Sequence, residues 1–148
     1  RFVKKIIKNV DLVDPIIFKW KADWILIASK SENEFLYNKL CVYITKNPLS
    51  TNWKPLDSNP IIESNILGRN AGLIKESNKK IFRISQAYLP GNYGAFISVN
   101  KILSIIKNKY IEKKINKIFP THEKNLKGIH TLSYVKNFTA FDYSKWVK

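Results

Sequence analysis

The chain has 148 residues, of which 45% are hydrophobic and 13% aromatic, a composition that excludes a disordered protein and suits one domain spanning residues 1–148. Lysine and arginine outnumber the acidic residues 26 to 11, and the formal charge of +15 raises nucleic acid and anionic membranes as partners. The lysines are spread from Lys4 to Lys148, with the densest stretch between Lys101 and Lys127. We therefore favour a solvated basic surface, keep a membrane surface as a candidate partner, and place nucleic acid below it.

Several protein classes are excluded by what the sequence lacks. No run of about 18 apolar residues occurs, and the basic start has neither the apolar core nor the cleavage site of a signal peptide, so a cytoplasmic location is favoured. Cys41 is the single cysteine, which excludes an intramolecular disulfide and a cysteine zinc site. The chain contains no methionine, and we expect it to belong to a longer protein.

Short runs rich in Val, Ile, Phe and Trp, separated by polar turn residues, predict successive β-hairpins along the chain. Asp14-Pro15 begins the first, because proline is tolerated at the first residue of a strand. The expected strands are 16–20, 23–29, 39–45, 69–76, 81–88, 93–105, 110–119, 128–137 and 138–146, with turns at 21–22, 77–79, 91–92, 107–109 and 136–137. Residues 101–119 also fit one amphipathic helix, but their β-branched content favours strands.

The sum is roughly nine or ten short strands in successive hairpins, a pattern typical of a sandwich, a barrel or a propeller. A weak internal repeat favours the propeller. Asp14-Pro15 precedes one aromatic hairpin, and Arg69 precedes another about 55 residues later.

The rare residues gather between residues 59 and 110. Arg69 and Arg83 are two of the three arginines, and four of the five glycines lie in the same stretch. Glycine allows tight backbone corners and arginine offers a planar fork of donors, so the clustering beside Gln86 and Tyr93 indicates a site. The alternative is a set of ordinary β-turns with surface arginines.

Motifs in this stretch resemble a known domain. They are Trp53, Leu56 and Asn59-Pro60-Ile61; then Arg69 with Ala71-Gly72; then Arg83 with Gln86; then Tyr93-Gly94. Their order is similar to the carboxyl-terminal part of the five-bladed β-propeller at the amino-terminal side of glucosamine inositolphosphorylceramide transferase. Such domains also occur beside sugar-modifying enzymes such as formyltransferases.

The resemblance implies an all-β fold: a five-bladed β-propeller of which this chain represents about three blades, with the rest of a parent chain completing it. It relates the fold to the propellers of arabinofuranosidases and invertases, whose sugar pocket lies on the central axis. The family pattern carries a "DP" aspartate near each early blade, and Asp14 is the one present here.

Sugars offer hydroxyl pairs and apolar C–H faces, so planar donors, amides and aromatic rings bind them. The candidate ligand-binding residues are Arg69, Arg83, Gln86, Tyr93 and His130. A glycosidase needs two carboxyl groups, and Asp14 with Glu112 is the candidate catalytic pair, although turn capping and ion pairing are the favoured roles for both. His122 and His130 share no suitably spaced carboxylate, so no metal or other cofactor is expected.

The sequence thus predicts a module that recognises a carbohydrate or glycolipid head group for a glycan-modifying protein. Two alternatives stay open. One is a glycosidase-like enzyme that uses Asp14 and Glu112, and the other is a basic surface that binds nucleic acid or an anionic membrane.

Overall fold

The computed structural model describes residues 4–31, 37–75, 78, 80–106, 109–121, 124–135 and 138–146. These residues form β-strands and no helix, and every strand pair is antiparallel, which confirms the all-β prediction. The described residues contain no helix that is long and apolar enough to cross a membrane.

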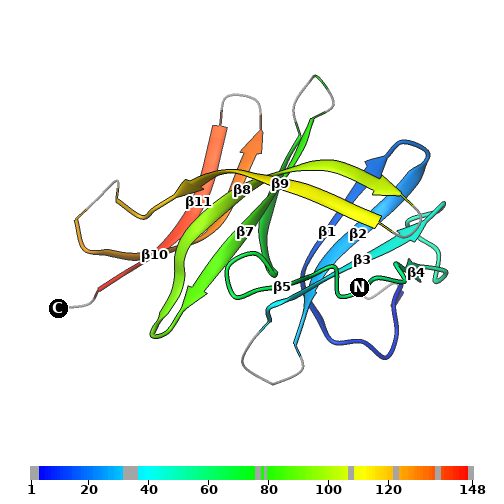
Figure 1. Ribbon diagram of the computed structural model, residues 1–148, viewed down its shortest axis with the longest axis horizontal. Helices are drawn as coiled ribbons and strands as arrows, with labels where there is room; N and C mark the ends of the chain where they lie inside the picture. Colours follow the sequence, from blue (N-terminus) through cyan, green and yellow to red (C-terminus); the bar gives the residue numbers. More distant parts are fainter. Residues whose placement is uncertain are drawn as a thin grey trace.

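The strands form three sheets that follow one another in chain order. The first contains β1 (Leu12–Trp20), β2 (Asp23–Lys30) and β3 (Lys39–Thr45), with the short strands β4 (Lys54–Pro55) and β5 (Ile62–Glu63) both paired to β3. The second contains β6 (Arg69–Lys75), β7 (Ile81–Leu89), β8 (Asn92–Ile106) and β9 (Lys109–Ile118), and the third is the hairpin of β10 (Leu126–Val135) and β11 (Phe138–Lys145). Figure 1 shows them side by side, from β1–β3 on the right to β10 and β11 on the left.

The predicted hairpins are present, and residues 101–119 are extended in β8 and β9 rather than helical. One turn differs from its prediction: Pro90 and Gly91 form it, while Asn92 already pairs with Leu89. Gly91 has a φ of 73° and takes the left-handed conformation that the turn requires. The turns expected at 77–79, 107–109 and 136–137 lie wholly or partly outside the described residues. The two-residue strands β4 and β5 were not predicted, because they are too short to show alternation.

Both faces of the first sheet are buried, which explains why β2 is an unbroken apolar run instead of an alternating one. Ile25 and Ile27 face the second sheet in a cluster that includes Ile102 and Ile105 of β8. Leu26 lies between them and points to the opposite face of the sheet. There it belongs to a second cluster, with Trp53 and with partly buried residues near the start of the described chain. Alternation along one strand therefore supplies two separate cores.

The Asn-Pro-Ile motif closes the first sheet. The Asn59 carboxamide accepts a hydrogen bond from the Val42 amide at 2.9 Å and donates one to the Val42 carbonyl at 2.8 Å. The Ile61 amide then donates to the Leu40 carbonyl at 2.8 Å. The Asn59 side chain thus provides hydrogen-bond partners for the backbone groups of Val42, which lie on the outer edge of β3 in the gap between β4 and β5. This is the physical reason for an asparagine at this point of the motif.

The second and third sheets approach each other so closely that a side chain on Gly72 would collide with the backbone of β10. A third cluster joins them, with Ala71, Ile84 and Ile97 against Ile129 and Leu132 of β10. A Cβ on Gly72 would lie 2.1 Å from the Leu132 carbonyl oxygen. The edge strand β6 contacts both β1 and β10, so the first strands of the three successive sheets lie next to one another.

Candidate functional site

The junction of the three first strands holds several of the predicted site residues, beginning with Asp14. A bulge between Val13 and Ile16 interrupts the pairing of β1 with β2, and Asp14 there has a φ of 51°, a left-handed conformation that is uncommon for a non-glycine residue. Its carboxylate Oδ2 accepts a hydrogen bond from Arg69 Nε at 2.8 Å, and the two side chains form a partly exposed ion pair. The bulge therefore aims an acidic side chain of the first sheet at the first residue of β6.

Arg69 is also held between aromatic rings. Its guanidinium carbon lies 5.3 Å from the ring centroid of Tyr37 and 5.0 Å from that of Tyr93, within the range of cation–π attraction. The rings and the guanidinium border a recess of about 50 Å³ that is completed by Asn38, Asn65, Gln86 and Tyr88. This recess is far smaller than an ordinary ligand pocket, so a ligand would rest across its mouth.

His130 lies on the other side of Tyr93. The two rings form an edge-to-face pair with centroids 4.4 Å apart. His130 Nδ1 lies 3.4 Å from Asp142 Oδ2, while its buried Nε2 has no hydrogen-bond partner among the described residues. Burial raises the pKa of Tyr93, and the charge of Arg69 only partly offsets this, so the phenol stays protonated at neutral pH. The recess is therefore lined by a protonated tyrosine, and His130 contacts the ring of that tyrosine.

Asn70 links these elements, although it was not among the site residues predicted from the sequence. It is fully buried, and its Nδ2 donates to the Asp14 carbonyl at 3.0 Å and to the Ile27 carbonyl at 3.1 Å. Its backbone carbonyl accepts a hydrogen bond from Gln86 Nε2 at 2.9 Å. The side chain and the backbone carbonyl of Asn70 thus link β1, β2, β6 and β7. The available signal was its place directly after Arg69, inside the motif with Ala71-Gly72.

Arg83 lies inside the molecule and does not border the recess. Its side chain is fully buried; Nε donates to Glu112 Oε2 at 2.9 Å and Nη2 donates to Oε1 at 2.6 Å, a bidentate ion pair. Burial by itself lowers the pKa of Arg83, but the hydrogen bonds and charge of Glu112 raise it above its usual value. Nη1 reaches Asn70 Oδ1 at 3.2 Å, so Arg83 supports the site through Asn70.

Glu112 is enclosed with the same arginine. Its side chain is 7% exposed and also accepts a hydrogen bond from the Tyr110 hydroxyl at 2.6 Å. Burial is the main reason that the pKa of Tyr110 is raised, so the hydroxyl keeps its proton and continues to donate. Asp14 and Glu112 are thus each paired with a different arginine, and neither lines the recess.

Of the predicted site residues, the structure brings Asp14, Arg69, Gln86, Tyr93 and His130 together and places Arg83 and Glu112 behind them. Tyr37 and Asp142 are neighbours that sequence reasoning missed, since neither belongs to a motif. His122 lies outside the described residues. Among the residues that are described, no three His, Cys, Asp or Glu side chains gather to hold a metal ion.

Residues 2–145 match the family described as glucosamine inositolphosphorylceramide transferase 1, N-terminal. The chain belongs to this family. The match spans almost the whole sequence, including all three sheets, and agrees with the resemblance carried by the Arg-Gly motifs. No curated protein and no solved structure matches the chain.

Proposed function

We propose that this chain is a carbohydrate- or glycolipid-recognising module of a glycan-modifying protein, and that its sheets are consecutive blades of a five-bladed β-propeller. Three features support the propeller: sequential meander sheets, first strands that adjoin one another, and cores between successive sheets. Further chain would complete the ring. Family membership supports the association with a glycosyltransferase.

The observation that carries the binding function is the contact series from Asp14 through Arg69 and Tyr93 to His130. These residues come from β1, β6, β8 and β10, so all three sheets contribute where their first strands meet. A charged fork, a phenol ring and a carboxylate suit the hydroxyl pairs and apolar faces of a sugar. The enclosure of Glu112 with Arg83 favours this binding function over the glycosidase-like alternative, because a general acid must reach the bond that it protonates.

An array of neutral, amino-sugar and inositol-phosphate-bearing glycans tests the proposal. We expect the protein to retain a defined subset of the glycans, and Arg69→Ala and Tyr93→Ala each to lose most of that signal. Tyr134→Ala is the control, since Tyr134 is an exposed tyrosine of β10 and lies outside the recess. Retention of every glycan signal by both Arg69→Ala and Tyr93→Ala would refute this site.

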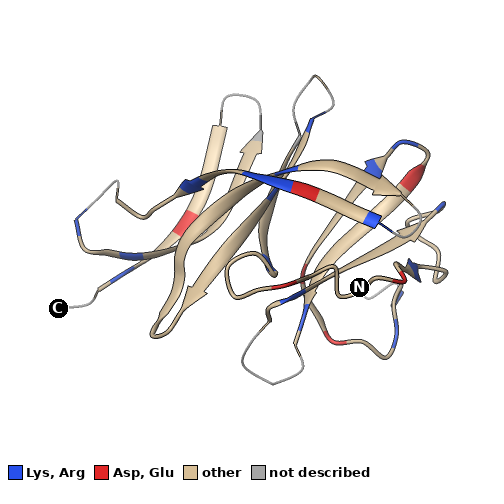
Figure 2. Ribbon diagram, in the orientation of Figure 1, with Lys and Arg blue, Asp and Glu red and all other residues tan. Residues whose placement is uncertain are grey.

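A second candidate function rests on the outer ribbon, which we define as Lys101, Leu103, Lys109, Ile111, Lys113 and Ile115 of β8 and β9. The pairings Lys101 with Lys113 and Ser104 with Ile111 place lysine and isoleucine on one face, while Ile102 and Glu112 turn to the other. Leu103 and Ile115 are 47% and 52% exposed. None of the three lysines forms an ion pair within the described chain. Figure 2 shows the basic segments along β9.

Apolar side chains interleaved with unpaired lysines suit the interface of an anionic bilayer. We therefore infer that the outer ribbon holds the protein on a membrane that contains acidic lipid. In vesicle sedimentation, Lys113→Glu and Ile115→Ser should each reduce binding to phosphatidylserine vesicles, whereas Lys19→Glu and Ile17→Ser on β1 should not. If a DNA duplex binds and loses affinity with Lys113→Glu but not with Ile115→Ser, while vesicles do not bind, the ribbon is a nucleic-acid surface and the membrane inference fails.

A further inference from the structure

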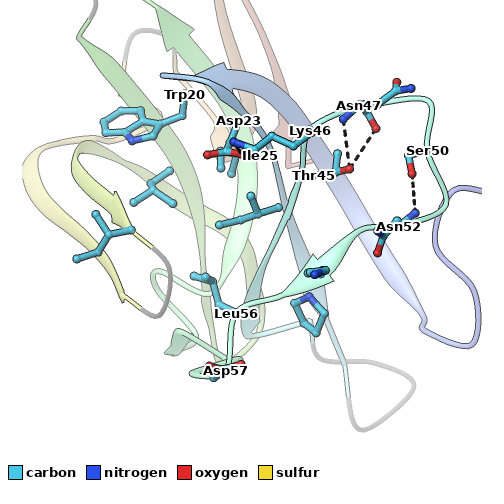
Figure 3. Close-up of a pocket in the computed structure, with 15 residues that line it drawn as sticks. Trp20, Asp23, Ile25, Thr45, Lys46, Asn47, Ser50, Asn52, Leu56 and Asp57 are labelled. Carbon is cyan, nitrogen blue, oxygen red and sulfur yellow. Dashed lines mark hydrogen bonds and ion pairs between the residues drawn. The ribbon is translucent and has the colours of Figure 1, made fainter.

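A second and much larger cavity lies at the opposite end of the first sheet. Its volume is about 680 Å³, within the usual range for small-molecule sites. It is bordered by the β1–β2 turn, the end of β3, the loop that follows, and the last residues of β8 (Figure 3). Trp20, at the end of β1, lines it, whereas Asp14 lies near the start of that strand, and the cavity shares no lining residue with the recess beside Arg69.

Much of the cavity lining is apolar. Trp20 lies on the side away from the loop after β3 (Figure 3), and the other apolar lining residues are Ile25, Ile44, Pro55, Leu56, Ile105 and Ile106. The Trp20 indole Nε1 is buried and has no acceptor among the described residues, which is uncommon for a buried donor. Ile106 remains 52% exposed although it is an isoleucine. An apolar ligand would cover the exposed isoleucine.

The loop after β3 forms a polar side of the cavity, and hydrogen bonds within the loop hold its shape. Asn47, Ser50 and Asn52 lie together on the loop after β3, on the side away from Trp20 (Figure 3). The Asn52 amide donates to Ser50 Oγ at 2.8 Å, and Asn47 Oδ1 accepts a hydrogen bond from the Leu49 amide at 3.0 Å. The Asn52 carboxamide makes no hydrogen bond in the described chain, so it is available to a ligand hydroxyl.

The charges around the cavity cancel. Asp23 and Lys46 form an ion pair at 2.7 Å, and Lys54 and Asp57 contribute one charge of each sign. Such a lining gives no net attraction for an anion or a cation, in contrast to the rest of this strongly basic chain. The cavity therefore favours an uncharged ligand.

We propose that this cavity binds an uncharged amphiphile: an alkyl chain with a hydroxylated head, such as a neutral alkyl glycoside. The chain lies against Trp20, Ile105 and Ile106, and the head hydroxyls bond to Asn47, Ser50 and Asn52. The site does not depend on the Asp14–Arg69 ion pair or on recognition at the recess.

The probe is n-octyl β-glucoside below its critical micelle concentration, measured by calorimetry together with the indole N–H resonance of Trp20, which a Trp20→Phe variant assigns. We expect saturable binding at one site with a shift of that resonance. Glucose alone should bind at least about tenfold more weakly, because it lacks the apolar contact.

Two variants locate the binding. Ile106→Gln and Asn52→Ala should each weaken octyl glucoside binding by about three- to tenfold, while Ile17→Gln, which changes another exposed isoleucine that lies outside the cavity, should not. Arg69→Ala should leave it unchanged. Unaltered affinity in both cavity variants overturns the proposal, and so does loss of binding in Arg69→Ala alone, which would assign the glucoside to the recess. Failure of the glycan array leaves this measurement intact, so the two proposals are judged separately.

Discussion

At the scale of single residues, the two carboxylates predicted as a catalytic pair have opposite environments. Asp14 is 37% exposed and pairs with Arg69 at the surface, whereas Glu112 is 7% exposed and pairs with a fully buried arginine. An exposed ion pair contributes little to stability, but the loss of one partner of a buried pair leaves an uncompensated charge in the interior. Glu112 is therefore a structural residue whose removal should be felt by the whole fold.

We predict that Glu112→Gln lowers the free energy of unfolding by about 3–5 kcal/mol, because it keeps the shape of the side chain but leaves the Arg83 charge unpaired. Urea denaturation followed by circular dichroism measures this. Glu63→Gln is the matched control: Glu63 is 59% exposed, its contact with Lys39 is 3.6 Å long, and its loss should cost less than about 1 kcal/mol. Equal effects of the two changes would show that Arg83 does not depend on Glu112.

At the scale of elements, the site depends on how closely β8 and β10 approach. Gly94 has a φ of 69°, and a Cβ there would lie 2.8 Å from the Ile129 carbonyl oxygen. A Cβ on Gly128 would lie 2.6 Å from the Tyr93 carbonyl oxygen. These two glycines allow the strands to lie backbone against backbone, and the Tyr93–His130 ring pair forms beside them.

We predict that Gly94→Ala costs clearly more stability than Gly91→Ala. Both glycines have positive φ, 69° and 73°, so both substitutions carry the left-handed penalty of about 1–2 kcal/mol. Only Gly94 also has backbone within reach of an added methyl group, since nothing lies within 4 Å at Gly91. Thermal denaturation compares the two. A cost at Gly91 that equals the cost at Gly94 would mean that the approach of β10 is not tight.

At the scale of the whole molecule, groups that lose a proton only at high pH are buried in two different sheets. Burial raises the pKa of Cys41 in the first sheet and that of Tyr110 in the second. The folded protein therefore holds protons that the unfolded chain releases above the ordinary values of 9.0 for the thiol and 10.0 for the phenol.

Because both pKa values are higher in the folded protein than in the unfolded chain, the stability from these two groups is complete below about pH 9 and is lost as the pH rises. We predict that the free energy of unfolding is level up to about pH 8.5 and falls steadily between about pH 9 and 11. Urea denaturation across that range, with Cys41→Ala for comparison, measures the slope. The variant should show a shallower decline, and an equal slope would exclude the thiol as a source.

The local part of the fold was predictable from sequence. Runs of β-branched and aromatic residues between turn residues specify hairpins, because a hairpin forms between segments that are adjacent in the sequence. The extended conformation of residues 101–119 was predicted from the same β-branched content. The clustering of Arg69, Gln86 and Tyr93 was also visible, as rare residues in one stretch.

Which residues form hydrogen bonds and ion pairs with one another was decided only by the tertiary structure. Asn70 bonds to a carbonyl 56 positions away. Arg69 and Arg83 were both predicted as ligand-binding residues, yet Arg69 is partly exposed and Arg83 is fully buried. No local pattern encodes these outcomes, since they depend on which sheet stacks against which. The sequence by itself determined the all-β hairpins and the family motifs; the stacking of three sheets decided which of those residues line the recess and which lie buried behind it.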